Sequence, residues 1–342
     1  MRDCPYRYHN LYIMHVKNVH TTYGESMNYA ISTENLTKTY PKAKQPAVEN
    51  LNLKIREGEI FGFLGPNGSG KTTTFKILCT LLLPTSGRAY VNGYDVINET
   101  RNVQMSIGAV MESERSFYWR LTGEENLMRF ASYFYIPIKD AKNRISELME
   151  RFDLLQHKDK QVGKYSRGMK AKLSIIRALL PDPPILFFDE PWLGLDVETK
   201  LELKNLILSI AKKEKKTVFL CSHELSLVEE ICDNVAIISK GCVFIEGEPE
   251  KLIEKIGSRE SIVMRGAFSE EDVQKIQTLR DVLILHQSKK DAIHIAVKKA
   301  ANTLPALYEN LGSKIENISV TNVSLEDVYL YFSAEESKNE GI

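Results

Sequence analysis

One eight-residue segment constrains the fold of this chain more than any other. Residues 65–72 read Gly-Pro-Asn-Gly-Ser-Gly-Lys-Thr, which has the spacing G-x-x-x-x-G-K-[ST] of a phosphate-binding loop. This motif requires a strand before it and a helix after it. Residues 59–64 are mostly apolar and predict the strand, and residues 71–82 have helical spacing. The segment therefore predicts an α/β fold with a parallel sheet.

The chemistry of this segment is suited to nucleotide phosphates. Glycines let backbone N–H groups approach phosphate oxygens, because no Cβ stands in the way. The start of the following helix adds unpaired N–H donors and a partial positive charge. Lys71 is predicted to reach the β- and γ-phosphates, and the Thr72 hydroxyl is predicted to bind Mg²⁺. The predicted nucleotide-binding residues of the loop are Gly65, Pro66, Asn67, Gly68, Ser69, Gly70, Lys71 and Thr72.

Two carboxylates follow a second apolar run. Residues 184–188 lack polar alternation, which predicts a strand buried on both faces, and Asp189 and Glu190 come directly after it. Ligands of open α/β sheets bind outside the carboxyl ends of the strands. Asp189 is suited to coordinate Mg²⁺. Glu190 is positioned to orient or deprotonate the water that attacks the γ-phosphate. Loop and carboxylates together predict an ATPase or a GTPase.

A third segment indicates which kind. Residues 165–169, Tyr-Ser-Arg-Gly-Met, place Ser166 at the N-cap of a predicted helix. The start of this helix is a second anion site. Because the chain has only one phosphate-binding loop, a second phosphate-binding helix start suggests that two chains form a dimer. The order of motifs resembles the nucleotide-binding subunit of ATP-binding cassette (ABC) transporters over about residues 31–246: the loop, Ser166-x-Gly168, Asp189-Glu190, Gly194-Leu195-Asp196 and His223.

The resemblance implies a P-loop NTPase fold with an inserted helical subdomain, ATP and Mg²⁺ as ligands, and a role for each matching residue. Ser166 and Gly168 match the signature that contacts the γ-phosphate of ATP on the opposite subunit. Asp196 matches the loop that joins the two sites across the dimer, and His223 matches the switch histidine at the γ-phosphate. Further implied contacts are an adenine stack on Tyr40 and phosphate or Mg²⁺ binding by Lys71, Thr72 and Thr73.

Two positions depart from the family pattern. The usual signature L-S-G-G-Q reads Tyr-Ser-Arg-Gly-Met here, an S-x-G-M form that is frequent in drug-exporting ABC ATPases. The family usually has a Mg²⁺-contacting glutamine after the strand predicted at residues 107–110. Here Glu112 stands nearby, and we predict that its carboxylate approaches Mg²⁺.

The sequence predicts three parts. Residues 1–30 show little periodicity and predict a poorly ordered leader. Residues 31–246 form the ATP-binding domain, with the helical subdomain at about 112–181. Residues 255–335 follow the order β-α-β-β-α-β and predict a small ferredoxin-like domain with a regulatory or dimer-stabilising role.

Composition narrows the function classes. The chain has 45 Lys and Arg against 45 Asp and Glu, so its formal net charge is zero and no basic surface for nucleic acid is expected. The longest segment without these residues is 77–87, too short for a membrane-spanning helix, which needs about 20 residues. The five cysteines form no C-x-x-C pair, so neither a disulfide framework nor a zinc cage is predicted.

The sequence therefore predicts the ATPase subunit of an ABC exporter, at the cytoplasmic face of the membrane. It would form a homodimer or pseudo-dimer and drive a multi-span permease. Residues 117–120, Phe-Tyr-Trp-Arg, are predicted to line the groove that receives a permease helix, or alternatively to pack inside the helical subdomain. Residues 324–330 resemble a motif that closes the C-terminal extension of drug and antibiotic exporters. Two alternatives remain: a non-transport ABC ATPase acting on ribosomes or nucleic acid, and an importer subunit.

Overall fold

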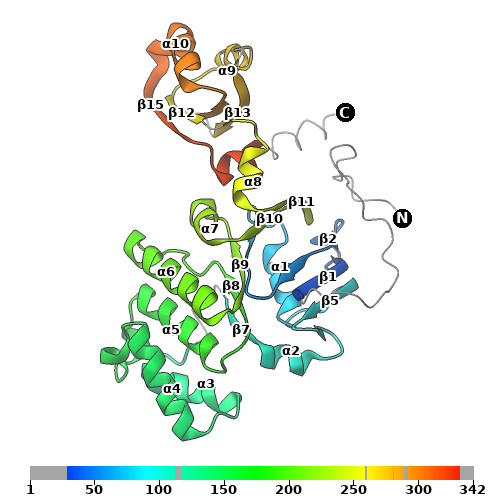
Figure 1. The fold of residues 1–342 in the computed structure, drawn as a ribbon, viewed down its shortest axis with the longest axis vertical. Helices are drawn as coiled ribbons and strands as arrows, with labels where there is room; N and C mark the ends of the chain where they lie inside the picture. Colours follow the sequence, from blue (N-terminus) through cyan, green and yellow to red (C-terminus); the bar gives the residue numbers. More distant parts are fainter. Residues whose placement is uncertain (1–28, 112–116, 259, 280, 289–291, 332–342) are drawn as a thin grey trace. The chain divides into compact units, whose positions relative to one another are not determined.

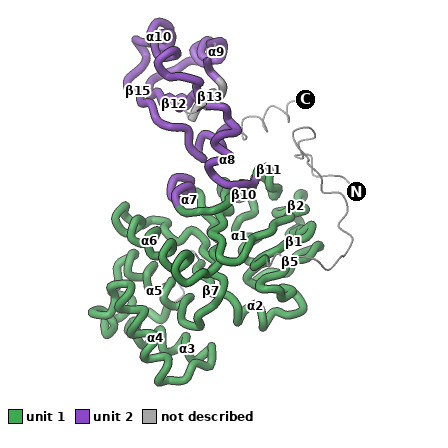
Figure 2. Tube along the Cα trace, viewed as in Figure 1, with its two compact units in different colours: residues 1–223, 231–245 green, residues 224–230, 246–342 purple. Residues whose placement is uncertain are grey.

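The computed structural model describes residues 29–331 apart from 112–116, 259, 280 and 289–291. The predicted leader therefore lies almost entirely outside the described residues, and Glu112 lies outside them too. The chain divides into two compact units, residues 1–223 with 231–245 and residues 224–230 with 246–342 (Figure 2).

A six-stranded sheet carries the predicted loop and carboxylates (Figure 1). Three of its strands, β4, β8 and β9, are buried along their whole length, as expected where both faces of a parallel sheet are covered. Four adjacent pairs, from β10 to β7, run parallel, so these strands end at one common edge. Across the sheet the order is β11 (Cys242–Gly247), β10 (Asn234–Ser239), β4 (Ile60–Leu64), β9 (Thr217–Ser222), β8 (Ile185–Asp189) and β7 (Ile107–Val110).

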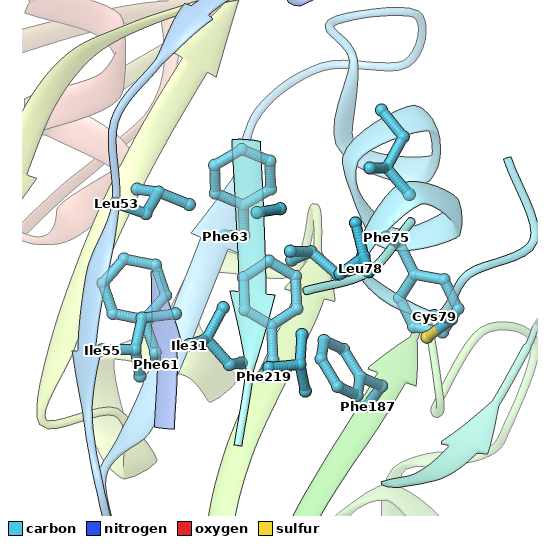
Figure 3. Packing of buried hydrophobic residues seen from close by; sticks show 14 of the residues in the cluster. Ile31, Leu53, Ile55, Phe61, Phe63, Phe75, Leu78, Cys79, Phe187 and Phe219 are labelled. Atoms are coloured by element: carbon cyan, nitrogen blue, oxygen red, sulfur yellow. The ribbon is translucent and has the colours of Figure 1, made fainter. Parts of the chain in front are cut away.

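A second, antiparallel sheet shares one hydrophobic core with the first. Phe219 lies at the centre of this core, with its ring centroid 5.5 Å from those of Phe63 and Phe187 and 6.1 Å from that of Phe61 (Figure 3). Burying each such side chain contributes about 1.5–3 kcal/mol. The second sheet contains β2 (Val48–Leu51), β1 (Tyr29–Lys38), β5 (Ser86–Val91) and β6 (Tyr94–Asp95), with β3 (Lys54–Arg56) paired to β1.

Helix α1 (Lys71–Leu78) starts directly after the phosphate-binding loop and ends earlier than predicted. The prediction that it continues to Leu82 is wrong. Thr80 has a φ of 61°, and the N–H groups of Leu81 and Leu82 turn back to the carbonyl oxygen of Lys76. This is a left-handed helix ending, and it turns the chain toward β5.

The segment predicted as the helical subdomain is mostly helical, and its first helix begins with a capping box of the form T-x-x-E. The Glu125 N–H donates to Thr122 Oγ1 over 3.1 Å, and the Thr122 N–H donates to Glu125 Oε2 over 2.7 Å. Within the described residues, no helix combines the length and apolarity needed to span a membrane. The helices between residues 112 and 181 are α3 (Gly123–Tyr133), α4 (Ile138–Arg151), η2 (Leu155–His157), η3 (Val162–Lys164) and α5 (Arg167–Leu179); α2 (Thr100–Ser106) precedes this segment and α6 (Val197–Glu214) follows it.

The second unit follows the predicted order of elements. Its four strands form an antiparallel sheet in the order β13-β14-β12-β15, with a core between the sheet and helices α9 and α10. The ferredoxin-like assignment stays a prediction. The elements are α7 (Leu225–Ile231), α8 (Pro249–Glu254), β12 (Glu260–Gly266), α9 (Glu270–Gln277), β13 (Val282–Ser288), β14 (Ala292–Val297), α10 (Ala300–Leu311), η4 (Gly312–Lys314) and β15 (Ile315–Asn322), before a helical stretch at 325–331.

Candidate active site

The phosphate-binding loop is packed so closely that two of its glycines are required. Gly70 has a φ of 115°, and a Cβ there would lie 2.4 Å from the carbonyl oxygen of Ala47. At Gly65 a Cβ would lie 2.2 Å from the carbonyl oxygen of Ile238, on β10. Only glycine fits at these two positions, and the loop can therefore adopt the backbone conformation that exposes its N–H groups to a ligand.

Lys71 is held by the loop that precedes it. Only 5% of this residue is exposed, and its Nζ donates to the carbonyl oxygens of Gly65 (2.6 Å) and Pro66 (3.0 Å). No side chain caps α1 at Gly70, and its first turn contains no acidic residue. Unpaired N–H groups and a buried ammonium thus meet at one helix start, which favours an anion.

The structure brings the loop and the two carboxylates to one cavity of about 150 Å³. Asp189 is nearly buried at the end of β8, and Thr72 lines the same cavity. A carboxylate and a hydroxyl are hard oxygen ligands of the kind that Mg²⁺ prefers, so these residues fit that ion. The residues that line the cavity are Ala47, Asn67, Gly68, Gly70, Lys71, Thr72, Thr73, Asp189 and Glu190.

Glu190 lies at the centre of a small polar network. It follows β8 directly, has a φ of 50°, and its N–H donates to the Cys221 carbonyl oxygen over 3.0 Å. Its Oε1 is 2.7 Å from His223 Nδ1, and its Oε2 accepts a 3.4 Å hydrogen bond from Ser222 Oγ. Strands β8 and β9 are neighbours, and this pairing places the predicted carboxylate beside the predicted histidine.

Two buried cysteines near this network stay neutral. Burial raises the pKa of the Cys79 and Cys221 thiols well above the usual value, and the negative charge of Asp189 adds to the effect. A neutral buried thiol is neither a nucleophile nor a metal ligand at physiological pH. The charged groups of the cavity are therefore the carboxylates and Lys71.

Tyr40 lies at the margin of the loop. Its hydroxyl is 3.3 Å from Thr73 Oγ1, and the residue is 39% exposed. Lys38 Nζ lies 5.7 Å from the ring centroid. The predicted adenine-stacking residue is thus connected to the phosphate-binding helix by a side-chain contact.

Ser166, Gly168 and Asp196 form a second cluster, and none of them lines the cavity. Ser166 Oγ caps α5 by accepting from the Met169 N–H over 3.2 Å. Asp196 caps α6 by accepting from the Thr199 N–H over 2.9 Å, and the two hydrogen bonds from Thr199 lower the pKa of Asp196.

The two helix starts meet within one chain. A Cβ on Gly168 would lie 2.9 Å from Thr199 Cγ2, so α5 and α6 approach closely here and a larger residue would force the Thr199 side chain to shift. Arg167 Nη1 donates to the Gly194 carbonyl oxygen over 3.5 Å. The arginine that departs from the family pattern therefore connects the signature segment to the segment that carries Asp196.

Comparison with known proteins identifies the family. Residues 48–193 match the family described as ABC transporter. The chain is 40% identical over 230 residues to the bacitracin transport ATP-binding protein BcrA of Bacillus licheniformis, over 67% of this chain and 70% of BcrA. The chain belongs to the ATP-binding proteins of ABC transporters. It is also 30% identical over 316 residues to the daunorubicin resistance ATP-binding protein DrrA2 of Streptomyces coeruleorubidus, over 91% of this chain and 97% of DrrA2.

Solved structures agree with this membership. The dimeric ATP-binding cassette MJ0796, in a post-hydrolysis state bound to ADP and Pi, superposes with a TM-score of 0.59 at 26% identity, covering 64% of this chain and 98% of that one. The predicted P-loop NTPase fold is confirmed, and the chain is an ABC ATPase that binds and hydrolyses ATP. Sequence reasoning missed Ser222 and Trp192 in the network around Glu190, although Ser222 directly precedes the predicted His223.

Proposed function

We propose that this chain is the ATPase subunit of an exporter. It would bind at the cytoplasmic face of the membrane and drive a separate membrane permease. The observation that carries the proposal is an exposed aromatic pair in the helical subdomain. Tyr118 and Trp119 are 45% and 52% exposed, whereas Phe117 is buried with its ring 6.0 Å from that of Phe130. Exposed aromatic residues of this kind mark interaction sites.

Positive charges flank this pair. The Arg129 guanidinium lies 4.5 Å from the ring centroid of Tyr118, and Lys170 Nζ lies 5.1 Å from that of Trp119. Cation–π contacts of this kind hold the rings in a defined orientation at the surface. Lys170 belongs to α5, the helix that Ser166 caps, so a partner on the aromatic pair would be connected to the signature segment.

The direction of transport is proposed from two lines of support. The S-x-G-M signature and the segment at residues 324–330 resemble drug and antibiotic exporters. The names of two relatives refer to bacitracin transport and to daunorubicin resistance. Residues 255–335 would regulate or stabilise the dimer.

The proposed cycle uses two copies of the chain, as in the dimeric relative. Lys71 and Thr73 hold the phosphates, and Tyr40 stacks on adenine. Mg²⁺, held by Thr72 and Asp189, would neutralise phosphate charge, and Glu112 is proposed to approach it. Glu190 orients or deprotonates the attacking water, while His223 contacts the γ-phosphate. The second copy supplies the remaining proposed contacts through Ser166, Gly168 and Asp196.

Co-purification tests the proposal. A tag on this chain should recover a multi-span membrane protein from detergent-solubilised native membranes, together with ATPase activity that Lys71→Ala abolishes. The double variant Tyr118→Ala/Trp119→Ala should lose the membrane protein and stay folded. Tyr308→Ala is the matched control, because Tyr308 is 51% exposed in the other unit. Recovery of ribosomes or DNA without a membrane protein would contradict the proposal that this chain is part of an exporter.

A second experiment tests the role of Glu190. Glu190→Gln removes the base and keeps the shape of the side chain, so we expect a closed, ATP-loaded dimer with turnover lost. The dimer is detected by gel filtration in the presence of ATP. Steady-state turnover at the wild-type rate would contradict the assignment.

A further inference from the structure

We propose that Trp192 is a positioning residue for ATP hydrolysis, whose indole N–H acts through Ser222 to hold the carboxylate of Glu190. Trp192 is fully buried, and its Nε1 donates to Ser222 Oγ over 3.0 Å. Ser222 Oγ in turn donates to Glu190 Oε2 over 3.4 Å. The inference rests on the role proposed above for Glu190.

The direction of these hydrogen bonds follows from the groups involved. An indole N–H can only donate, and an ionised carboxylate can only accept. The hydroxyl between them has one proton and two lone pairs. When Trp192 occupies a lone pair of Ser222, the serine proton is directed to Glu190, which lies on the other side of the hydroxyl.

The two carboxylate oxygens of Glu190 have different partners. Oε1 faces His223, whose side chain is 43% exposed. Oε2 faces the hydrogen-bonded pair of Ser222 and Trp192, which we call the buried arm. In the proposed cycle His223 turns to the γ-phosphate and leaves Oε1 to the attacking water. The buried arm then remains to hold the carboxylate plane, because its hydrogen bonds do not involve the ligand.

Trp192 also fixes the short connection that follows Glu190. The Leu193 N–H donates to the Glu190 carbonyl oxygen, and the Leu195 N–H donates to the Trp192 carbonyl oxygen, each over 3.2 Å. These two turns lead to Asp196, the cap of α6. A displaced indole would therefore move both the proposed base and the segment proposed to join the two ATP sites.

Trp192→Phe tests the inference, because phenylalanine keeps a buried aromatic ring and removes the N–H donor. The assay is steady-state hydrolysis of Mg-ATP by the full chain. We expect kcat to fall about tenfold, which is less than the roughly 100-fold that a 1 Å misplacement can cost. KM for ATP should stay within about twofold, because the nucleotide contacts are unchanged. Phe152→Leu is the control: this aromatic residue is 1% exposed in the helical subdomain, and its loss should lower stability without changing kcat.

Ser222→Ala gives a second, independent route to the same hydrogen bonds. It should lower kcat as Trp192→Phe does, and the double variant should be no slower than Ser222→Ala alone, because both changes interrupt one path. The chain has two tryptophans, so a proton–nitrogen NMR spectrum contains two indole signals. The Trp192 signal should shift in Ser222→Ala, which a purely packing role would not produce.

Three results would overturn the inference: wild-type kcat in Trp192→Phe, effects of the two changes that multiply, or a loss of activity matched by the unfolded fraction. The Glu190→Gln variant separates this failure from failure of the proposed function. If Glu190→Gln is inactive and Trp192→Phe is fully active, only the positioning role is wrong. If Glu190→Gln keeps turnover, the proposed base and the positioning role fail together.

Discussion

Ser166→Ala separates two roles of one hydroxyl. In the structure Ser166 Oγ accepts from the Met169 N–H over 3.2 Å and caps α5. Losing an N-cap costs about 1 kcal/mol, whereas a domain is stable by about 5–15 kcal/mol, so the variant stays folded. In the proposed dimer the same hydroxyl donates its proton to the γ-phosphate of the opposite site, which is compatible with accepting at α5. A hydrogen bond to a charged group contributes about 2 kcal/mol, so we expect kcat/KM to fall about 30-fold.

Thr122→Ala is the matched control for the cap. Thr122 caps α3 by accepting from the Glu125 N–H over 3.1 Å, and no contact with ATP is predicted for it. Urea denaturation should show a loss of about 1 kcal/mol in both variants. ATPase assays should show a loss of kcat/KM in Ser166→Ala alone. Equal activity in the two variants would refute the reasoning, because Ser166 would then act only as a helix cap.

Three further outcomes are expected. Gly70→Ala should weaken ATP binding at least about tenfold in a fluorescent-nucleotide titration, because the new Cβ would lie 2.4 Å from the Ala47 carbonyl oxygen; unchanged affinity would contradict the packed loop. Phe219→Ala should lower the free energy of unfolding by about 4 kcal/mol in urea, with a loss below 1 kcal/mol arguing against the core described. The Lys314 ammonium lowers the pKa of Asp272 to about 2. The ionised Asp272 carboxylate therefore stabilises the folded chain fully above pH about 4, and this stabilisation is lost as the pH falls toward 2. The stability gap between wild type and Asp272→Asn should therefore narrow from pH 5 to pH 2.5 in thermal melts, and a constant gap would exclude this ion pair as its source.

Local chemistry made much of the site readable from the sequence. The loop at residues 65–72 depends on glycine backbone freedom and on one lysine, both of which are visible as letters. Strands β9 and β10 coincide with mostly apolar runs of the sequence, residues 217–222 and 234–239, and such runs indicate strands buried on both faces. The capping box at Thr122 can be read from the sequence because its hydrogen bonds join residues only three positions apart.

Tertiary structure alone decided how the separate motifs meet. Trp192 contacts Ser222 across 30 residues, Arg167 contacts Gly194 across 27, and no periodicity in the sequence encodes either pair. The first contact exists because β8 and β9 are neighbours in the sheet, and the second because α5 and α6 start side by side. The sequence by itself determined which groups could bind and hydrolyse ATP. Only the packing of strands and helices, which joins distant residues through directional hydrogen bonds, decided which buried side chains hold Glu190.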